Sequence, residues 1–127
     1  MILDTTVLID LMKADINAIN KIKELKERKL VTTPTIFELW SGITKSNKPE
    51  QEKRKVLEIL DSQLILNLDR KSAEEAGKIS GTLIKEGETI DTEDSMIAGI
   101  AKVHNESILT RNVDHFNRIR DIKIETY

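Results

Sequence analysis

The amino-terminal stretch Met1-Ile2-Leu3-Asp4-Thr5-Thr6-Val7-Leu8-Ile9-Asp10 places an acid directly after a short apolar run, followed by two threonines and a second apolar run. This order predicts a buried strand, a sharp turn and the start of a helix. Asp4 then lies at the carboxyl end of the strand. Ligands of open α/β sheets bind at that edge, so a carboxylate there is well placed to hold a cation.

Short apolar runs alternate with amphipathic segments through the rest of the chain. The apolar runs predict further strands at 30–33, 63–68, 107–110 and 122–125. The remaining segments predict helices at 5–13, 15–29, 33–43, 50–61, 69–85 and 91–104. Strands that alternate with helices form parallel βαβ units with right-handed crossovers. We therefore expect an α/β fold of three layers, α/β/α, with a mostly parallel sheet.

The composition is that of an ordinary globular chain. Of 127 residues, 39% are hydrophobic and 33% are charged, and this length predicts one domain over residues 1–127. No apolar run approaches the ~20 residues of a membrane span, and no secretion signal is recognised, so we expect a cytoplasmic protein without membrane association. The chain has no cysteine, which excludes disulfides and thiolate metal sites.

The formal net charge of -2 argues against a protein that binds nucleic acid by bulk electrostatics. Carboxylates that cluster in one pocket and hold divalent cations reverse the local field at a phosphodiester. The net charge therefore leaves action on nucleic acid open.

Glu38 is an acid within an apolar segment. Its helix starts at Thr33 and Pro34, which predict a hydroxyl cap and a proline in the first turn. The residues three and four positions away, on the same helix face, are all small: Pro34, Thr35, Ser41 and Gly42. They leave a shallow gap beside the acid, with room for a metal or a sugar phosphate. The alternative is a glutamate that points to solvent through a narrow polar stripe.

A third acid, Asp94, lies in the first turn of the helix that Asp91 or Thr92 caps. The helix dipole favours an acid there with or without chemistry, so simple capping is the alternative. The polar turn 111–116 follows the fourth strand and reaches the same edge of the sheet. Asp4, Asp94 and this turn are therefore expected to meet at this edge, with the Glu38 side chain directed toward them.

The chain has two histidines, and neither is required for chemistry at such a site. His104 is expected on the core-facing side of its helix as a packed residue, and His115 is expected to make a loop contact.

Four pieces of the sequence together resemble the PIN domain, and within it the VapC-type toxin ribonucleases of VapBC toxin–antitoxin pairs. The pieces are Leu3-Asp4-Thr5-Thr6-Val7-Leu8-Ile9, Thr35-Ile36-Phe37-Glu38-Leu39 with Gly42, Asp94-Ser95-Met96-Ile97-Ala98, and Thr110-Arg111-Asn112 with Phe116. The resemblance covers essentially the whole chain and implies Mg²⁺- or Mn²⁺-dependent RNA cleavage. It also implies a homodimer and inhibition by a small antitoxin protein.

The resemblance assigns metal-site and catalytic carboxylates to Asp4, Glu38 and Asp94. Three further residues take supporting positions: Thr6, Asp91 and Thr110. Many relatives place a fourth acid where this chain has Asn112, with Asp114 two residues later. Asn112 through its carbonyl, Asp114, or a three-acid site all remain open. Such carboxylates suit a magnesium ion shared with a substrate phosphate.

Lys45 and Arg111 are candidate contacts for RNA phosphates, and an exposed solvated charge is the alternative for each. Three other functions remain in view. The first is a PIN-domain nuclease for RNA processing or decay, and the second is a non-catalytic PIN-like binding module, which Asn112 favours. The third is a phosphohydrolase resembling haloacid dehalogenases, whose second aspartate would stand at Thr6.

Overall fold

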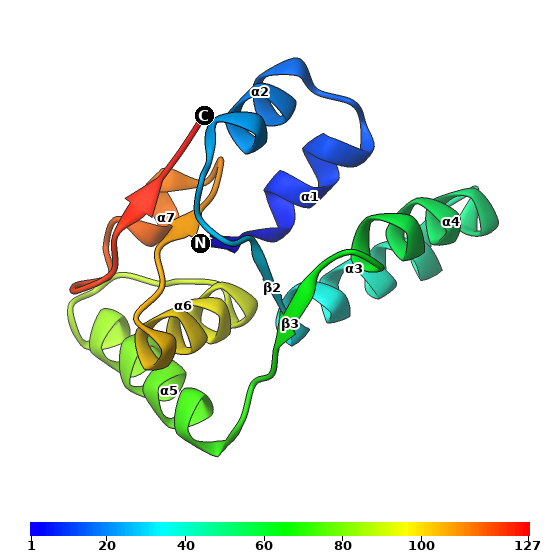
Figure 1. Cartoon of the computed structure of the whole chain (residues 1–127). Helices are drawn as coiled ribbons and strands as arrows, with labels where there is room; N and C mark the ends of the chain where they lie inside the picture. The colour runs from blue at the N-terminus through cyan, green and yellow to red at the C-terminus, as the bar shows by residue number, and fades with distance from the viewer.

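The computed structural model describes residues 1–127 and places five parallel strands between two layers of helices (Figure 1). The strands are β1 (Ile2–Leu3), β2 (Leu30–Thr32), β3 (Leu64–Leu66), β4 (Ile108–Leu109) and β5 (Ile124–Glu125). Their order in the sheet is β3-β2-β1-β4-β5, and every neighbouring pair is parallel. The predicted three-layer α/β/α fold is confirmed, with strands shorter than the apolar runs that predicted them.

The helices occupy the segments between the strands. They are α1 (Thr5–Met12), α2 (Ile16–Glu24), α3 (Thr33–Lys45), α4 (Pro49–Leu60), α5 (Arg70–Lys85), α6 (Thr92–His104) and α7 (Val113–Phe116). All six predicted helices are present, although α2 ends at Glu24, well short of residue 29. The short helix α7 lies in a segment that the sequence predicts as a turn.

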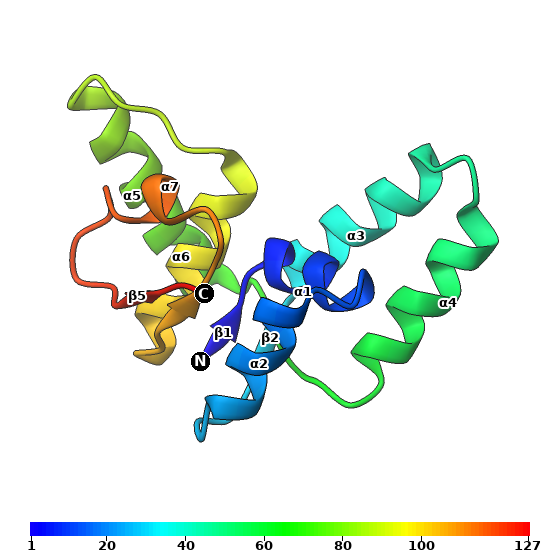
Figure 2. The same cartoon turned by 90° about the horizontal axis from the view of Figure 1, so that it is seen from above.

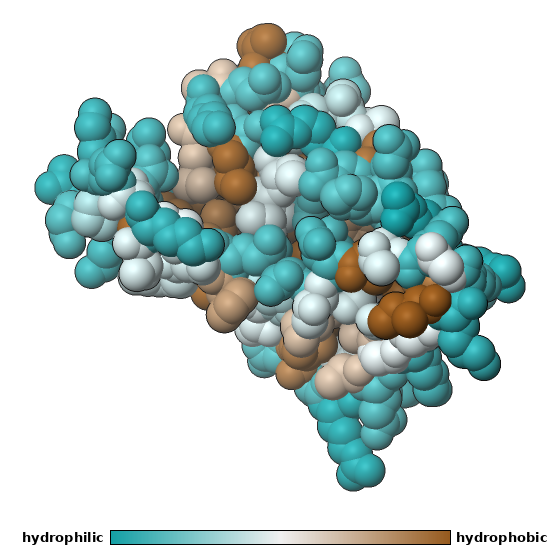
Figure 3. All heavy atoms as spheres, turned by 180° about the vertical axis from the view of Figure 1, so that it is seen from behind, coloured by the Kyte–Doolittle hydropathy of each residue, from teal (hydrophilic) through white to brown (hydrophobic).

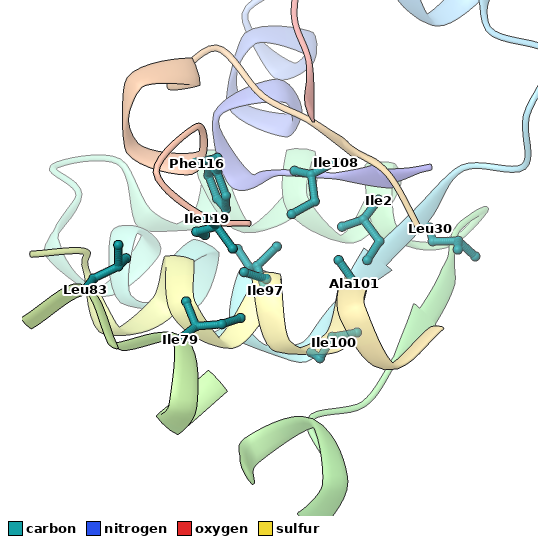
Figure 4. Packing of buried hydrophobic residues seen from close by; sticks show 11 residues of the cluster. Ile2, Leu30, Ile79, Leu83, Ile97, Ile100, Ala101, Ile108, Phe116 and Ile119 are labelled. Atoms are coloured by element: carbon teal, nitrogen blue, oxygen red, sulfur yellow. The ribbon is translucent and has the colours of Figure 1, made fainter. Parts of the chain in front are cut away.

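The sheet is buried on both faces because successive strand residues point to opposite sides. Ile2, Leu30 and Ile108 pack with α5 and α6 in one cluster, which Figure 4 shows from close by. Their neighbours in sequence pack with α1, α3 and α4 in the second cluster: Leu3, Val31 and Leu109. Figure 2 shows the two layers, with α5, α6 and α7 on one side of the strands and α3 and α4 on the other.

Strand β1 lies at the centre, and the chain extends the sheet first through β2 and β3 and then, in the other direction, through β4 and β5. The direction in which successive strands are added to the sheet therefore reverses between β1 and β4. Open α/β sheets bind ligands in the crevice at the carboxyl ends of such strands. The turns after Leu3 and Leu109 therefore form the edge at which a site is expected.

Helix α6 packs very closely against α5 at Gly99. A Cβ atom at this position would lie 2.5 Å from the carbonyl oxygen of Ser72 and 2.7 Å from the backbone nitrogen of Ala76. No side chain fits there. This contact fixes the depth of α6, which carries Asp94 in its first turn.

Two local predictions are wrong. The Thr33 hydroxyl does not cap α3: the N-cap residue is Thr32, and its side chain makes no capping hydrogen bond. The Thr33 hydroxyl instead accepts a hydrogen bond from the backbone N–H of Leu68, at 3.0 Å. His104 is exposed and not packed in the core. It is the last residue of α6, where the chain leaves the buried layer through the left-handed Asn105.

The surface carries isolated apolar side chains on several elements. On the face in Figure 3, hydrophobic atoms form separate patches among hydrophilic ones. The large apolar residues with exposed surface are Ile16, Phe37, Trp40, Leu57, Leu64 and Ile84. No helix has both the length and the apolar character that crossing a membrane requires.

Candidate metal centre

Asp4 directly follows β1 and is only 2% exposed. Its Oδ2 atom accepts hydrogen bonds from the hydroxyls of Thr6, at 2.9 Å, and Thr110, at 2.7 Å. These two donors come from α1 and from the residue after β4. One carboxylate oxygen is therefore fixed by the protein, and the other has no hydrogen bond and is available to a cation.

The loop after β4 is tied to the same place. The Thr110 hydroxyl oxygen accepts the backbone N–H of Asn112, at 2.9 Å, and the Thr6 hydroxyl oxygen accepts that of Arg111, at 3.2 Å. Both supporting threonines thus connect the Asp4 carboxylate to this backbone. Hydrogen bonds to a charged group are stronger than neutral ones, so the arrangement holds Asp4 in one orientation.

Glu38 comes from α3 and is half-buried. Its Oε1 atom accepts a hydrogen bond from the Thr5 hydroxyl, at 2.7 Å. Burial raises the pKa of Glu38, and the charges of Asp4, Glu93 and Asp91 raise it further, against the lowering effect of the Thr5 bond. Because the charge of Asp4 acts on Glu38, the two carboxylates lie in the same region.

The space beside Glu38 matches the gap that the small residues of α3 predict. A Cβ atom on Gly42 would meet nothing within 4 Å. Glu38 and Gly42 line a cavity of about 250 Å³ between α1, α3 and α4.

Asp94, in the first turn of α6, is 7% exposed. Burial raises its pKa to about 7, with further contributions from the charges of Asp4, Glu38 and Asp91. No Lys or Arg forms an ion pair with Asp4, Glu38 or Asp94. Asp4, Glu38 and Asp94 lie at a ligand-binding edge without a Lys or Arg partner, and carboxylate oxygens suit a divalent cation such as Mg²⁺. The ligand atoms that lie within 4.8 Å of one another are those of Asp91, Asp94 and His115, and Asp4 and Glu38 are not among them.

The family model described as PIN domain matches residues 1–122 of the chain. The chain belongs to the PIN domain family. Among curated proteins, it is 30% identical to the tRNA(fMet)-specific endonuclease VapC of Salmonella typhimurium, over 85% of this chain and 87% of that protein. The predicted kinship with VapC-type PIN domains is thereby confirmed.

Two solved complexes contain chains with the same fold as this PIN domain. DNA-bound VapBC from Salmonella typhimurium includes a chain with a TM-score of 0.90 and 28% identity, covering 98% of this chain and 96% of that one. VapBC2 from Rickettsia felis, bound to a DNA fragment from its promoter, includes one with a TM-score of 0.91 and 25% identity, covering 99% and 97%.

Both candidates for the fourth position of the PIN domain site lie at the start of α7. Asp114 is exposed on α7 and does not join the acids around Asp94, while Asn112 caps α7 through its backbone. His115, on the same helix, lies near Asp94, with Nδ1 3.5 Å from Oδ2. Asp91, Asp94 and His115 each offer a ligand atom within 4.8 Å of the other two.

Sequence reasoning missed His115 as a neighbour of the site. The available signal was Phe116, a large apolar residue in a polar turn, which anchors this segment in the core and keeps its neighbour His115 close to the edge of the sheet. Phe116 is fully buried, whereas 48% of the His115 side chain is exposed.

The two candidate RNA contacts have different surroundings. Arg111 donates from Nη1 to Oδ1 of Asp10, at 2.7 Å, and Asp10 also accepts from the hydroxyl of Tyr127. Its guanidinium is therefore engaged in holding the loop after β4 against α1. Lys45 is exposed at the end of α3 and forms no ion pair.

Proposed function

We propose that this PIN domain, which spans residues 1–127, is a metal-dependent endoribonuclease and the toxin of a type II toxin–antitoxin pair. The observation that carries the proposal is the set of Asp4, Glu38 and Asp94: the charge of Asp4 raises the pKa of both other acids, and no Lys or Arg pairs with any of the three. Membership of the family of VapC ribonucleases supports the reaction class. An RNA substrate implies action in the cytoplasm.

Asp4, Glu38 and Asp94 would hold the cation, as Mg²⁺ or Mn²⁺. When bound, such an ion polarises a phosphoryl oxygen and lowers the pKa of a water molecule. Thr6 and Thr110 orient Asp4, and Thr5 orients Glu38, so each carboxylate presents one oxygen to the site. This preorganisation removes the need to reorder the acids when substrate arrives.

RNA cleavage by the purified protein tests the reaction. Activity should need Mg²⁺ or Mn²⁺, stop with EDTA, and be lost in Asp4→Asn and Asp94→Asn. Asp61→Asn is the matched control because Asp61 is exposed at the end of α4, away from the site. Cleavage that survives chelation or either substitution at the site would rule the proposal out.

Growth tests the role as a toxin. Induced expression should arrest growth, and co-expression of a neighbouring small reading frame should relieve the arrest. A nuclease that cleaves RNA without arresting growth would instead be a processing or decay enzyme.

We propose a small antitoxin as partner, since the similar solved structures are VapBC complexes. The cavity beside Glu38 offers it a place to bind, with an apolar wall made of Ile9, Met12, Leu39, Ile43 and Val56. A chain that lies there reaches the acidic site. Gly42→Leu should fill the cavity without a clash at its Cβ, which would meet nothing within 4 Å, and the antitoxin should then bind more weakly in a titration.

We also propose a homodimer that buries the apolar surface of α3. Phe37 is 63% exposed and Trp40 is 38% exposed, and Phe37 lines an apolar hollow with Pro34 and Met96. Such surface on one helix is typical of a protein interface. Light scattering should give a dimer for the wild type and a monomer for Phe37→Lys, and a wild-type monomer at micromolar concentration contradicts the proposal.

A further inference from the structure

Asp10 is a buried carboxylate that takes no part in the proposed metal centre. It lies on α1, is 4% exposed, and accepts hydrogen bonds at both of its carboxylate oxygens. Oδ1 accepts from Nη1 of Arg111, at 2.7 Å, and Oδ2 accepts from the hydroxyl of Tyr127. Burying a charged carboxylate is costly unless it is paired and hydrogen-bonded, so Asp10 holds both partners in place. It thereby ties α1 to the loop after β4 and to the segment after β5.

Tyr127 is the only tyrosine of the chain and is a fixed donor in this group. Burial raises the pKa of its hydroxyl, and the hydrogen bond to Asp10 and the charge of Asp10 raise it further. The hydroxyl is therefore protonated near neutral pH and donates to Asp10. The tyrosine side chain also packs against the apolar cluster of α1, α3 and α4, which fixes its direction.

Arg111 connects this group to the metal centre through its own backbone. Its N–H donates to the Thr6 hydroxyl, at 3.2 Å, and that hydroxyl donates to Oδ2 of Asp4, at 2.9 Å. The N–H of Asn112 makes a parallel connection to the Thr110 hydroxyl, at 2.9 Å. That second hydroxyl donates to the same oxygen of Asp4, at 2.7 Å. A hydroxyl that accepts a hydrogen bond is a stronger donor, so the loop backbone strengthens the hold on Asp4 through both threonines.

The side chain of Arg111 anchors this loop to α1. It is 56% exposed, but its guanidinium makes no hydrogen bond or ion pair other than the one with Asp10. The start of the loop is held from the opposite side, where the N–H of Thr110 donates to the carbonyl oxygen of Glu125 on β5, at 3.0 Å. The segment after β5 carries Tyr127, so the same stretch of chain supports the loop at two points.

We infer that Asp10, Arg111 and Tyr127 form a clamp that positions the Asp4 carboxylate for the cation, with Arg111 acting through the loop after β4 and not by contact with RNA. The inference rests on the proposed function, since the cation is the one that the nuclease uses. All three are positioning residues. Removing either donor leaves a buried oxygen of Asp10 without its partner, which favours a rearrangement of the loop and of the hydroxyls that hold Asp4.

Mn²⁺ binding without RNA, followed by electron paramagnetic resonance, tests the clamp directly. Arg111→Gln should weaken binding about tenfold or more, the loss typical of a residue that supports a metal ligand. Tyr127→Phe removes one hydroxyl that does not contact Asp4, and it should weaken binding about threefold or more, below that typical range.

Ile79→Val is the matched control, because it removes one methyl group from the core on α5 and lowers the stability away from the clamp. It should bind Mn²⁺ as the wild type does. Thermal unfolding in EDTA checks that all three variants are folded at the temperature of the titration.

RNA cleavage distinguishes the clamp from an RNA contact. At low Mn²⁺ concentration, Arg111→Gln and Tyr127→Phe should both lower kcat, excess Mn²⁺ should restore it, and the KM for RNA should stay at the wild-type value. A guanidinium that binds a phosphate would instead raise KM in Arg111→Gln, reduce the salt dependence of RNA binding by about one phosphate contact, and leave Tyr127→Phe unaffected. That second pattern would overturn the inference.

Wild-type Mn²⁺ affinity in either clamp variant also overturns the inference. The clamp would then contribute to stability alone, or Tyr127 would have no part in it. The outcome is separate from that for the nuclease. If both variants lose Mn²⁺ affinity but the wild type cleaves no RNA, the clamp stands and the proposed function fails. If the wild type cleaves RNA with Mn²⁺ and both variants bind the ion as tightly, the reverse holds, and a wild type that binds no Mn²⁺ overturns both.

Discussion

Asp94→Asn should make the metal-free protein more stable while removing its ability to bind a cation. Burial together with the charges of Asp4, Glu38 and Asp91 raises the pKa of Asp94 from 3.8 to about 7. At about 1.4 kcal/mol for each pKa unit, ionised Asp94 costs the folded state about 4 kcal/mol at about pH 8. This is a large fraction of the 5–15 kcal/mol that stabilises a typical domain. Asparagine has nearly the same shape and carries no charge.

The dependence on pH has a definite sign. Because the pKa of Asp94 is higher in the folded state, its contribution to stability is fully present below about pH 4 and is lost as the pH rises through about 7. The advantage of Asp94→Asn over the wild type should therefore shrink by more than half between about pH 8 and about pH 5.

Urea unfolding in EDTA at both pH values measures the free energy of unfolding. Asp61→Asn, at an exposed position, should change it little at either pH. A metal-free Asp94→Asn protein that is less stable than the wild type at pH 8 would contradict this prediction, because burial and the neighbouring acids would then not destabilise the ionised Asp94. So would an advantage that does not depend on pH.

Four other substitutions follow from the surroundings of single residues and are measured by the same urea unfolding. Thr110→Val removes the buried hydroxyl that donates to Asp4 at 2.7 Å and should cost about 1.5–3 kcal/mol; an unchanged stability would contradict this. Gly99→Ala forces a Cβ to 2.5 Å from the α5 backbone and should cost about 3 kcal/mol, whereas Gly42→Ala, with open space, should gain about 1 kcal/mol; equal effects would be contrary to expectation. Tyr127→Phe removes a hydrogen bond to the buried aspartate of α1 and should cost about 1.5 kcal/mol, and a neutral result would mean that this bond contributes nothing.

The sequence was a good guide to the fold because the strands are short apolar runs with few alternatives. A residue such as Ile2 packs on one face of the sheet and its neighbour Leu3 on the other, so continuous apolar runs mark strands that are buried on both sides. The end of the first run fixed the place of Asp4. The small residues around Glu38 likewise indicated the cavity beside it.

Features that depend on tertiary contacts could not be read from the sequence. The four-residue helix α7 is too short to show a periodicity, and its direction depends on Phe116 entering the core. The position of His115 follows from that direction. Helical spacing placed His104 on the core face, but spacing does not reveal where the covering layer ends.

The charge balance near the site also depends on the fold. Arg111 follows β4 at the same edge as Asp4, which made it a candidate for contact with phosphate. In the structure its guanidinium pairs with the buried Asp10, an acid that the sequence shows only as one charge in an apolar helix. Long-range ion pairs of this kind have no local signature.

The central claim is that Asp4, Glu38 and Asp94 share one cation. A crystal soaked in Mn²⁺ and measured for anomalous scattering tests it most directly. A peak is expected about 2 Å from carboxylate oxygens of Asp4 and Asp94, with Glu38 facing the same ion directly or through water. A peak bound only by other acids, or none at millimolar Mn²⁺, would contradict it.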